Sequence, residues 1–405
     1  MRAVSRPLCF VLWSCLLVLL STSCGRTDVP TPWLPVDMAE SLDLATPDLA
    51  TPDLAAPRIV QIAAHSNHAC ARYSDGEALC WGGNHNGELG SGGYDETVAH
   101  VLYLSSPAAE VMLGESHVCA RLRDGSVNCL GDNYLGQLGD GTRNYTHVPI
   151  SVIGVMGATG LALGASFGCA LTGDGPAMCW GADQFGQLAT DGLSDGLIAE
   201  PILGGIAFSK LALGDYFTCG LGDQHVYCWG DNAQNQLGDY RLPTGPTVTE
   251  VADLDGVVQI AAGARHVCAL RATGQIVCWG DNTHGQLGDG TISSRTSPVS
   301  VVGIDGATAI ALGGAHGCAL LRDGGVRCWG ENLYGQNGDG TQLDRPFATS
   351  VIGLDQVTAL ALGDHHTCAL RSDGSVACWG DNTQGQVGDG TTTQSSAPVT
   401  IFIGH

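Results

Sequence analysis

Short apolar runs separated by small and polar residues dominate the chain from residue 58 onward. The run ALALG (359–363) is followed by HTCALR (366–371), by VACWG (376–380) and, after a glycine-rich segment, by APVTIFIGH (397–405). Alternating apolar and polar positions with β-branched residues, bounded by Gly, Asp and Asn, are typical of β-strands. The pattern predicts about four short strands in each unit of about 50 residues.

This unit recurs seven times, and two cysteines mark each copy. The cysteine pairs are Cys70 and Cys80, Cys119 and Cys129, Cys169 and Cys179, Cys219 and Cys228, Cys268 and Cys278, Cys318 and Cys328, and Cys368 and Cys378. Repeats of this length with about four strands each are the signature of propeller blades. We therefore expect an all-β, seven-bladed β-propeller with about four short antiparallel strands per blade.

The two ends of the repeat region suggest how the ring closes. The last unit continues into APVTIFIGH (Ala397 to His405), whereas the first unit begins at Arg58 with no such Pro-Val strand before it. We expect the N- and C-terminal strands to pair within one blade, because closure removes edges that would otherwise invite aggregation.

The repeat also resembles a known family. The stretch GDHHTCALRSDGSVACWGDNTQGQVGDGT (Gly363 to Thr391) is similar to the repeat of the regulator of chromosome condensation family, and the similarity recurs in all seven units. Local departures are Leu130 in place of Trp, Ala182 and Asp183 in place of Asp-Asn, and Asn235 in place of Gly. The resemblance implies a seven-bladed β-propeller. It also implies binding as a class of function, because members range from a nucleotide-exchange factor for a small nuclear GTPase to a secreted bacterial inhibitor of β-lactamases.

The cysteines of each unit are expected to face each other across a hairpin. If Ser372-Asp373-Gly374 forms a three-residue loop with Gly374 in the left-handed conformation, Cys368 opposes Cys378. Opposed residues have Cα atoms about 4.5–5.5 Å apart, within the disulfide range of about 4.4–6.8 Å. In the fourth unit Cys219 and Cys228 are one residue closer, and a two-residue loop, Asp223-Gln224, restores the opposition. We predict seven disulfides, in preference to free thiols.

A metal site is the competing interpretation, since His366, Cys368 and Cys378 form a ligand-like set. Two other units carry Phe167 and Phe217 at the position of His366 and keep both cysteines. A ligand cannot become Phe, whereas a packing residue can. We therefore predict no metal and no cofactor, and we expect the tryptophans that follow the second cysteines to pack between blades.

Charge and the N-terminus bound the possible partners and the location. The net charge is −23, which excludes the cationic surface that a nucleic-acid-binding protein needs. Arg2 and Arg6 precede an apolar run (8–20) and then Ser21 to Cys24, a pattern typical of a lipoprotein signal peptide. We expect residues 1–23 to be the signal peptide, Cys24 to be lipidated, residues 24–57 to be a Pro-rich tether, and residues 58–405 to form the propeller. The exported chain then meets an oxidising compartment, with the membrane contacted only through the lipid.

No catalytic arrangement stands out. Residues 164–168 (GASFG) match the G-x-S-x-G hydrolase pattern, but they precede a strand rather than a helix. Variation between units lies in the loops, where binding residues are expected on a rigid scaffold. Candidate interface residues are Tyr94, Tyr145, Tyr216, Tyr240, Arg241, Arg265 and Arg345, and Glu115, Asp364 and His365 belong to a second variable set. The glycine-rich Gly-Asp-Gly-Thr segments suggest turns rather than calcium loops.

The sequence thus predicts a monomeric, exported protein of a bacterial envelope, lipid-anchored or extracellular. We expect it to bind a protein partner without catalysis. A hydrolase acting on envelope polysaccharide or peptide, and a purely structural surface protein, are the alternatives.

Overall fold

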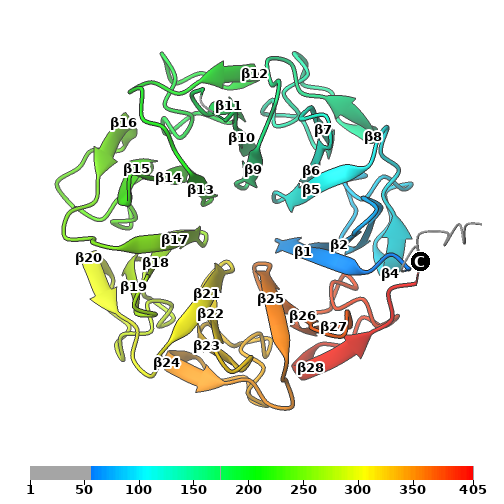
Figure 1. The fold of residues 1–405 in the computed structure, drawn as a ribbon, viewed down its shortest axis with the longest axis vertical. Helices are drawn as coiled ribbons and strands as arrows, with labels where there is room; N and C mark the ends of the chain where they lie inside the picture. The colour runs from blue at the N-terminus through cyan, green and yellow to red at the C-terminus, as the bar shows by residue number, and fades with distance from the viewer. Residues whose placement is uncertain (1–55, 174, 405) are drawn as a thin grey trace, which may run out of the picture. The chain divides into compact units, whose positions relative to one another are not determined.

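The computed structural model describes residues 56–404 except residue 174. The predicted signal peptide, lipidation site and tether lie outside these residues, apart from the last two residues of the tether. The described residues form seven four-stranded antiparallel sheets arranged as the blades of a ring (Figure 1). No helix of this part of the chain is long and apolar enough to cross a membrane. The predicted fold class, an all-β seven-bladed propeller, is confirmed.

The first two strands of each blade form its inner half. The innermost strands are β1 (Ile59–His65), β5 (Ala108–Leu113), β9 (Gly160–Leu163), β13 (Lys210–Leu213), β17 (Val257–Ala262), β21 (Ala307–Leu312) and β25 (Val357–Leu362). The second strands are β2 (His68–Tyr73), β6 (His117–Leu122), β10 (Phe167–Leu171), β14 (Phe217–Gly222), β18 (His266–Arg271), β22 (His316–Leu321) and β26 (His366–Arg371).

The outer half of each blade follows in sequence. The third strands are β3 (Ala78–Gly82), β7 (Val127–Gly131), β11 (Met178–Gly181), β15 (His225–Gly230), β19 (Ile276–Gly280), β23 (Val326–Gly330) and β27 (Val376–Gly380). The outermost strands are β4 (Glu96–Val101), β8 (Thr146–Ser151), β12 (Gly196–Pro201), β16 (Gly245–Glu250), β20 (Arg295–Ser300), β24 (Arg345–Ser350) and β28 (Ser395–Ile401).

The ring closes differently from the sequence-based expectation. In the described structure β1 pairs with β2 and β28 pairs with β27, so each blade is one continuous piece of chain and no blade combines the two ends. The expectation was wrong because the first blade already has its outermost strand, β4, whose sequence ETVAHV lacks the Pro-Val signature. Contacts between complete blades close the ring instead: Trp81 packs with Leu370 and Ile401 in one core cluster, and Asp364 N–H donates to the carbonyl of Ser66.

Because the outermost strands stay unpaired on one side, each blade keeps an edge. Six of these strands contain a proline, which cannot donate a backbone hydrogen bond and so discourages edge pairing. These prolines are Pro149, Pro201, Pro246, Pro298, Pro346 and Pro398.

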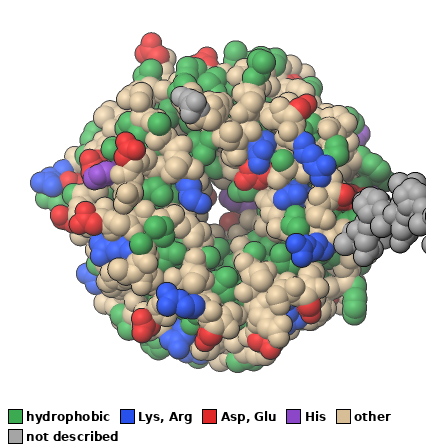
Figure 2. All heavy atoms as spheres, in the orientation of Figure 1, with side chains coloured by type: hydrophobic (Ala, Val, Ile, Leu, Met, Phe, Trp, Pro, Cys, Tyr) green, Lys and Arg blue, Asp and Glu red, His purple; other side chains and the backbone are tan. Residues whose placement is uncertain are grey.

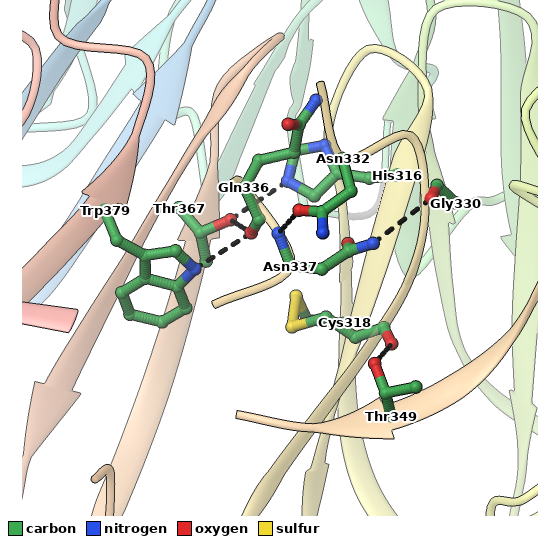
Figure 3. The surroundings of a disulfide bond; sticks show 10 residues. His316, Cys318, Gly330, Asn332, Gln336, Asn337, Thr349, Thr367 and Trp379 are labelled. Carbon is green, nitrogen blue, oxygen red and sulfur yellow. Dashed lines mark hydrogen bonds between the residues drawn. A yellow bond between two sulfur atoms is a disulfide. The ribbon is translucent and has the colours of Figure 1, made fainter. Parts of the chain in front are cut away.

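A buried tryptophan joins neighbouring blades. Figure 3 shows Trp379 of the seventh blade with its indole N–H donating to the backbone oxygen of Gln336 in the sixth blade, at 2.9 Å. The same bond recurs from Trp81, Trp180, Trp229, Trp279 and Trp329 to the glutamine carbonyl of the preceding blade. All six indoles are fully buried. The predicted packing of the tryptophans between blades is confirmed, and the hydrogen bond adds a polar link to it.

Candidate interaction face

The seven cysteine pairs are disulfides that staple the middle of each blade. Each joins directly opposed residues of the second and third strands, such as Cys368 and Cys378, with Cα atoms 4.1 Å apart. That distance lies just under the range from which the pairing was predicted. In the fourth blade Gly222 pairs with His225 and Cys219 with Cys228, so the two-residue turn at Asp223-Gln224 preserves the register as expected.

The histidines next to these disulfides belong to the interior. His117, His266 and His366 are fully buried, and burial lowers their pKa values to about 3, about 4 and about 3 respectively, so the rings are neutral. In Figure 3, His316 contacts the hydroxyl of Thr367 in the next blade, at 2.9 Å. Among the described residues no group of three His, Cys, Asp or Glu side chains is arranged to hold a metal.

The connections between strands emerge on two faces of the ring. Because strands within a blade are antiparallel, the segments that follow the first and third strands lie on one face, and those that follow the second and fourth strands lie on the other. We call these the long-loop face and the hairpin face. All seven predicted interface residues belong to the long-loop face.

Three of the predicted tyrosines project into solvent. Tyr94, Tyr145 and Tyr240 are 81%, 70% and 68% exposed, on the long loops of the first, second and fourth blades. Tyr216 is half-buried, since its ring packs against Phe185 with centroids 5.2 Å apart. The three exposed rings are therefore free to contact a partner, whereas Tyr216 is partly committed to the scaffold.

The predicted arginines differ in the same way. Arg345 donates through Nε to Asp339 at 2.6 Å and secures its own loop, as Arg295 does with Asp289 in the preceding blade. Arg241 pairs with Asp239 and lies 5.8 Å from the Tyr240 ring centroid. Arg265 is exposed in the short turn between β17 and β18. The structure thus separates a loop-fixing Arg345 from a solvent-facing Arg265.

An axial opening in the ring brings together groups from blades far apart in sequence, and Figure 2 shows the hole at the centre of the molecule. His65, Asp215 and Asp364 line its narrow part, a space of about 20 Å³. Backbone hydrogen bonds between blades hold the turns that form this narrow part: Asp215 N–H donates to the carbonyl of Ala264, and Asp364 N–H donates to that of Ser66. Burial, reinforced by the charges of Asp364 and Glu115, raises the pKa of Asp215 to about 7.

Sequence reasoning singled out Glu115, Asp364 and His365 but missed Asp215. All four occupy the short turns between the first and second strands, where the residue after the glycine varies from unit to unit. That variation was the available signal. Nδ1 of His365 lies 3.0 Å from a carboxylate oxygen of Glu331, and the His365 ring packs against Tyr334. Burial disfavours the charged form of His365, but its hydrogen bond to the Glu331 carboxylate raises its pKa.

An apolar space lies below the acidic level. The innermost strands line it with small and aliphatic side chains, including Ala212, Ala311 and Leu360, around a volume of about 250 Å³. The polar side chain of Gln259, on one of these strands, is hydrogen-bonded within the protein: it donates to the carbonyl of Ile310 on the next blade and accepts from the N–H of Ile310. The channel wall is therefore apolar in its middle and acidic at the long-loop end.

Comparison with known proteins identifies the repeat. The Regulator of chromosome condensation (RCC1) repeat matches residues 59–88, 159–187, 208–236, 257–286, 307–336 and 357–386, and a second form of this repeat matches residues 223–270 and 273–320. Neither matches the first three strands of the second blade, the one with Leu130 in place of Trp, although that blade has the same four strands. None of the curated proteins matches the chain by sequence.

Solved structures share the fold at low sequence identity. Prp20p from Saccharomyces cerevisiae, studied with its binding properties to Gsp1p and histones, is 21% identical, with 85% of this chain and 87% of that chain covered and a TM-score of 0.73. Yeast RCC1 (Prp20) bound to Kap60 is 21% identical, with 94% of this chain and 91% of that chain covered and a TM-score of 0.72. Human WBSCR16 is 22% identical, with 80% of this chain and 94% of that chain covered and a TM-score of 0.71. With its repeats matched over more than half of its length, the chain belongs to the regulator of chromosome condensation (RCC1) repeat family.

Proposed function

We propose that this chain is a non-catalytic scaffold that binds a protein partner through its long-loop face. The observation that carries the proposal is the display of Tyr94, Tyr145 and Tyr240, all strongly exposed, on loops of one face of a rigid ring. Tyrosine combines a large apolar ring with a polar tip and is enriched where proteins meet. The fold relatives named above support binding as a class, since Prp20p has been studied for binding Gsp1p and histones.

We place the protein outside the cytoplasm. A buried disulfide in every blade is typical of proteins from oxidising compartments. The sequence of residues 1–23 and Cys24 supports a bacterial envelope lipoprotein, with residues 24–57 as a tether. The proposed partner is a protein and the proposed assembly a single ring. The net charge of −23 disfavours nucleic acid.

One observation favours hydrolysis as a second candidate. Asp215 is a carboxyl with a raised pKa, beside a second carboxyl, Asp364, and such pairs serve as acid and base in glycoside hydrolysis. The space beside them, about 20 Å³, holds about one water and no sugar ring. Binding is therefore the better-supported function. Release of reducing sugar or peptide from envelope preparations that disappears in Asp215→Asn would favour the hydrolase instead.

Site-specific crosslinking tests the binding proposal. A photoreactive phenylalanine analogue at Tyr145 is expected to crosslink one envelope protein, and the same analogue at Tyr103 is expected to give none. Tyr103 is a matched control because it is 71% exposed on the hairpin face.

A triple variant provides the second arm. Replacing Tyr94, Tyr145 and Tyr240 by Ser should abolish capture of that protein, whereas replacing Tyr103, Met156 and Phe402 by Ser should not. The control residues are 71%, 86% and 95% exposed and lie on the hairpin face. Capture that survives the first triple variant and fails with the second would refute the assignment of the face.

A further inference from the structure

The cationic side chains of the two faces are used differently. On the long-loop face Arg143, Arg241, Arg295 and Arg345 each form an ion pair with an aspartate, at 3.0, 2.7, 2.6 and 2.6 Å. Across residues 56–404, residue 174 aside, Arg265 is the one Lys or Arg of this face that forms no ion pair. The hairpin face carries Arg58, Arg72, Arg121, Arg123, Lys210, Arg271, Arg322, Arg327 and Arg371.

This asymmetry bears on the meaning of the net charge. A solvated acidic surface that only keeps the protein soluble needs no difference between faces. Here the positive side chains gather on the hairpin face, and those of the long-loop face are mostly neutralised by their own loops. The long-loop face thus presents an excess of carboxylates to any partner, which favours a positively charged one.

The axial opening concentrates hydrogen-bond acceptors at the centre of that face. Asp215 and Asp364 line it, and Glu115 lies near enough to raise the pKa of Asp215. The fourth group is His65, which replaces the glycine that the other blades carry at this position. His65 lines the same opening. Its Nδ1 atom is shielded from solvent and has no hydrogen-bond partner among the described residues.

The size and the floor of the opening restrict what can enter. About 20 Å³ accommodates one water-sized group, such as an ammonium, and excludes a planar guanidinium of several heavy atoms. Below it the wall becomes apolar, with Ala212, Ala311 and Leu360, so a charged group gains nothing by going deeper. A lysine side chain, whose head has three N–H donors and whose stem is aliphatic, matches these conditions.

We propose that the long-loop face binds its protein partner by a lysine whose ε-ammonium enters the axial opening beside His65 and donates hydrogen bonds to Asp215 and Asp364. Tyr94, Tyr145 and Tyr240 contact the partner around this point. The inference rests on the proposed binding function and specifies the chemistry of the partner.

A defined peptide tests the proposal without knowledge of the partner. Fluorescence anisotropy of a labelled octalysine peptide with the full chain, at 150 mM NaCl, is expected to give saturable one-to-one binding. An octaarginine peptide should bind at least threefold more weakly, although its charge is the same. Asp215→Asn with Asp364→Asn should raise the octalysine Kd at least tenfold.

Matched variants separate the opening from bulk charge. Asp305→Asn with Asp355→Asn removes the same number of carboxyl groups from exposed hairpin-face loops and should change the Kd less than twofold. His65→Gly, which restores the residue of the other blades, should weaken octalysine binding about threefold without any change of carboxylate number. Melting temperatures of the two double variants should stay at or above the wild-type value, because Asn has the size of Asp and no cavity is formed.

The failing outcomes are distinct. Equal losses in the two double variants, equal affinity for the two peptides, or absence of saturable binding would overturn the lysine proposal. If the Tyr145 crosslink nevertheless forms, the proposed binding function stands and only the partner chemistry fails. Loss of that crosslink together with intact octalysine binding would remove the function and leave a small cation site.

Discussion

Glu88 and Gly83 of the first blade occupy the two positions that in the second blade hold Gln137 and Asp132, whose side chains are joined by a 2.8 Å hydrogen bond. The same glutamine-to-carboxylate bond recurs in other blades, for example from Gln386 to Asp381. In the first blade a carboxylate, Glu88, stands at the glutamine position, and Gly83 replaces the aspartate that would face it. Two carboxylates in contact are thereby avoided, but the remaining one is buried.

Replacement of Glu88 by Gln is expected to stabilise the fold at neutral and alkaline pH. Burial raises the pKa of Glu88 from 4.5 to about 7, so the folded state holds a proton that the unfolded state has lost. Stability from this group is full below pH 4.5 and falls as the pH rises to about 7, by at most about 3 kcal/mol. Denaturant unfolding at pH 4.5 and pH 8 should show a gain for Glu88→Gln at pH 8 alone. A gain of the same size at both pH values would contradict this cause.

The buried histidines impose the opposite pH dependence. The pKa of His366 is lowered by burial to about 3, so its folded-state pKa lies below the unfolded value of 6.5. Stability from keeping it neutral is full above pH 6.5 and is lost as the pH falls towards 3, about 2 kcal/mol of it by pH 5. His366→Phe copies Phe167 and Phe217 of other blades and removes that loss. Its unfolding free energy should change less than that of the wild type between pH 7.5 and pH 5, and an unchanged acid dependence would count against the mechanism.

The tryptophan junctions predict a difference between two similar substitutions. The carbonyl of Gln336 accepts from both Trp379 and the hydroxyl of Thr367, whereas that of Gln286 accepts from Trp329, with Gly317 at the position of the threonine. Trp379→Leu and Trp329→Leu should each lower stability by about 3 kcal/mol through lost packing. Trp329→Leu should cost about 1 kcal/mol more, because it leaves a buried carbonyl without its donor. Guanidinium unfolding of both variants measures the difference, and equal losses would show that packing alone matters.

Much of this scaffold could be predicted from the sequence, because the repeat supplies seven versions of each position. The cross-strand pairing of Cys219 with Cys228 followed from a spacing one residue shorter than in other units, and the replacement of His366 by Phe167 and Phe217 identified an interior residue. Closure was misjudged, since β4 lacks the proline that the other six outermost strands contain.

The axial site could be predicted only in part. Asp215 looks like an ordinary turn residue in sequence. Its burial and its closeness to Asp364, in blades four and seven, arise only when the ring is complete. Arg345 was predicted to be an interface residue because it lies in a variable loop. Its bond to Asp339, which only the structure shows, makes it part of the scaffold instead.

The hairpin of the fourth blade offers a stabilising change. Asp223 and Gln224 form its two-residue turn with φ values of 51° and 69°, both in the left-handed region. Turns of this kind favour Asn-Gly, because neither residue then strains at positive φ. Asp223→Asn with Gln224→Gly should raise the free energy of unfolding by about 1 kcal/mol without changing the Cys219–Cys228 register. Ala272→Gly, on an exposed hairpin residue outside the left-handed region, is the control and should lower stability instead. If both variants lose stability, the turn is not limited by backbone strain, and the shortened fourth hairpin is held by its disulfide rather than by its turn.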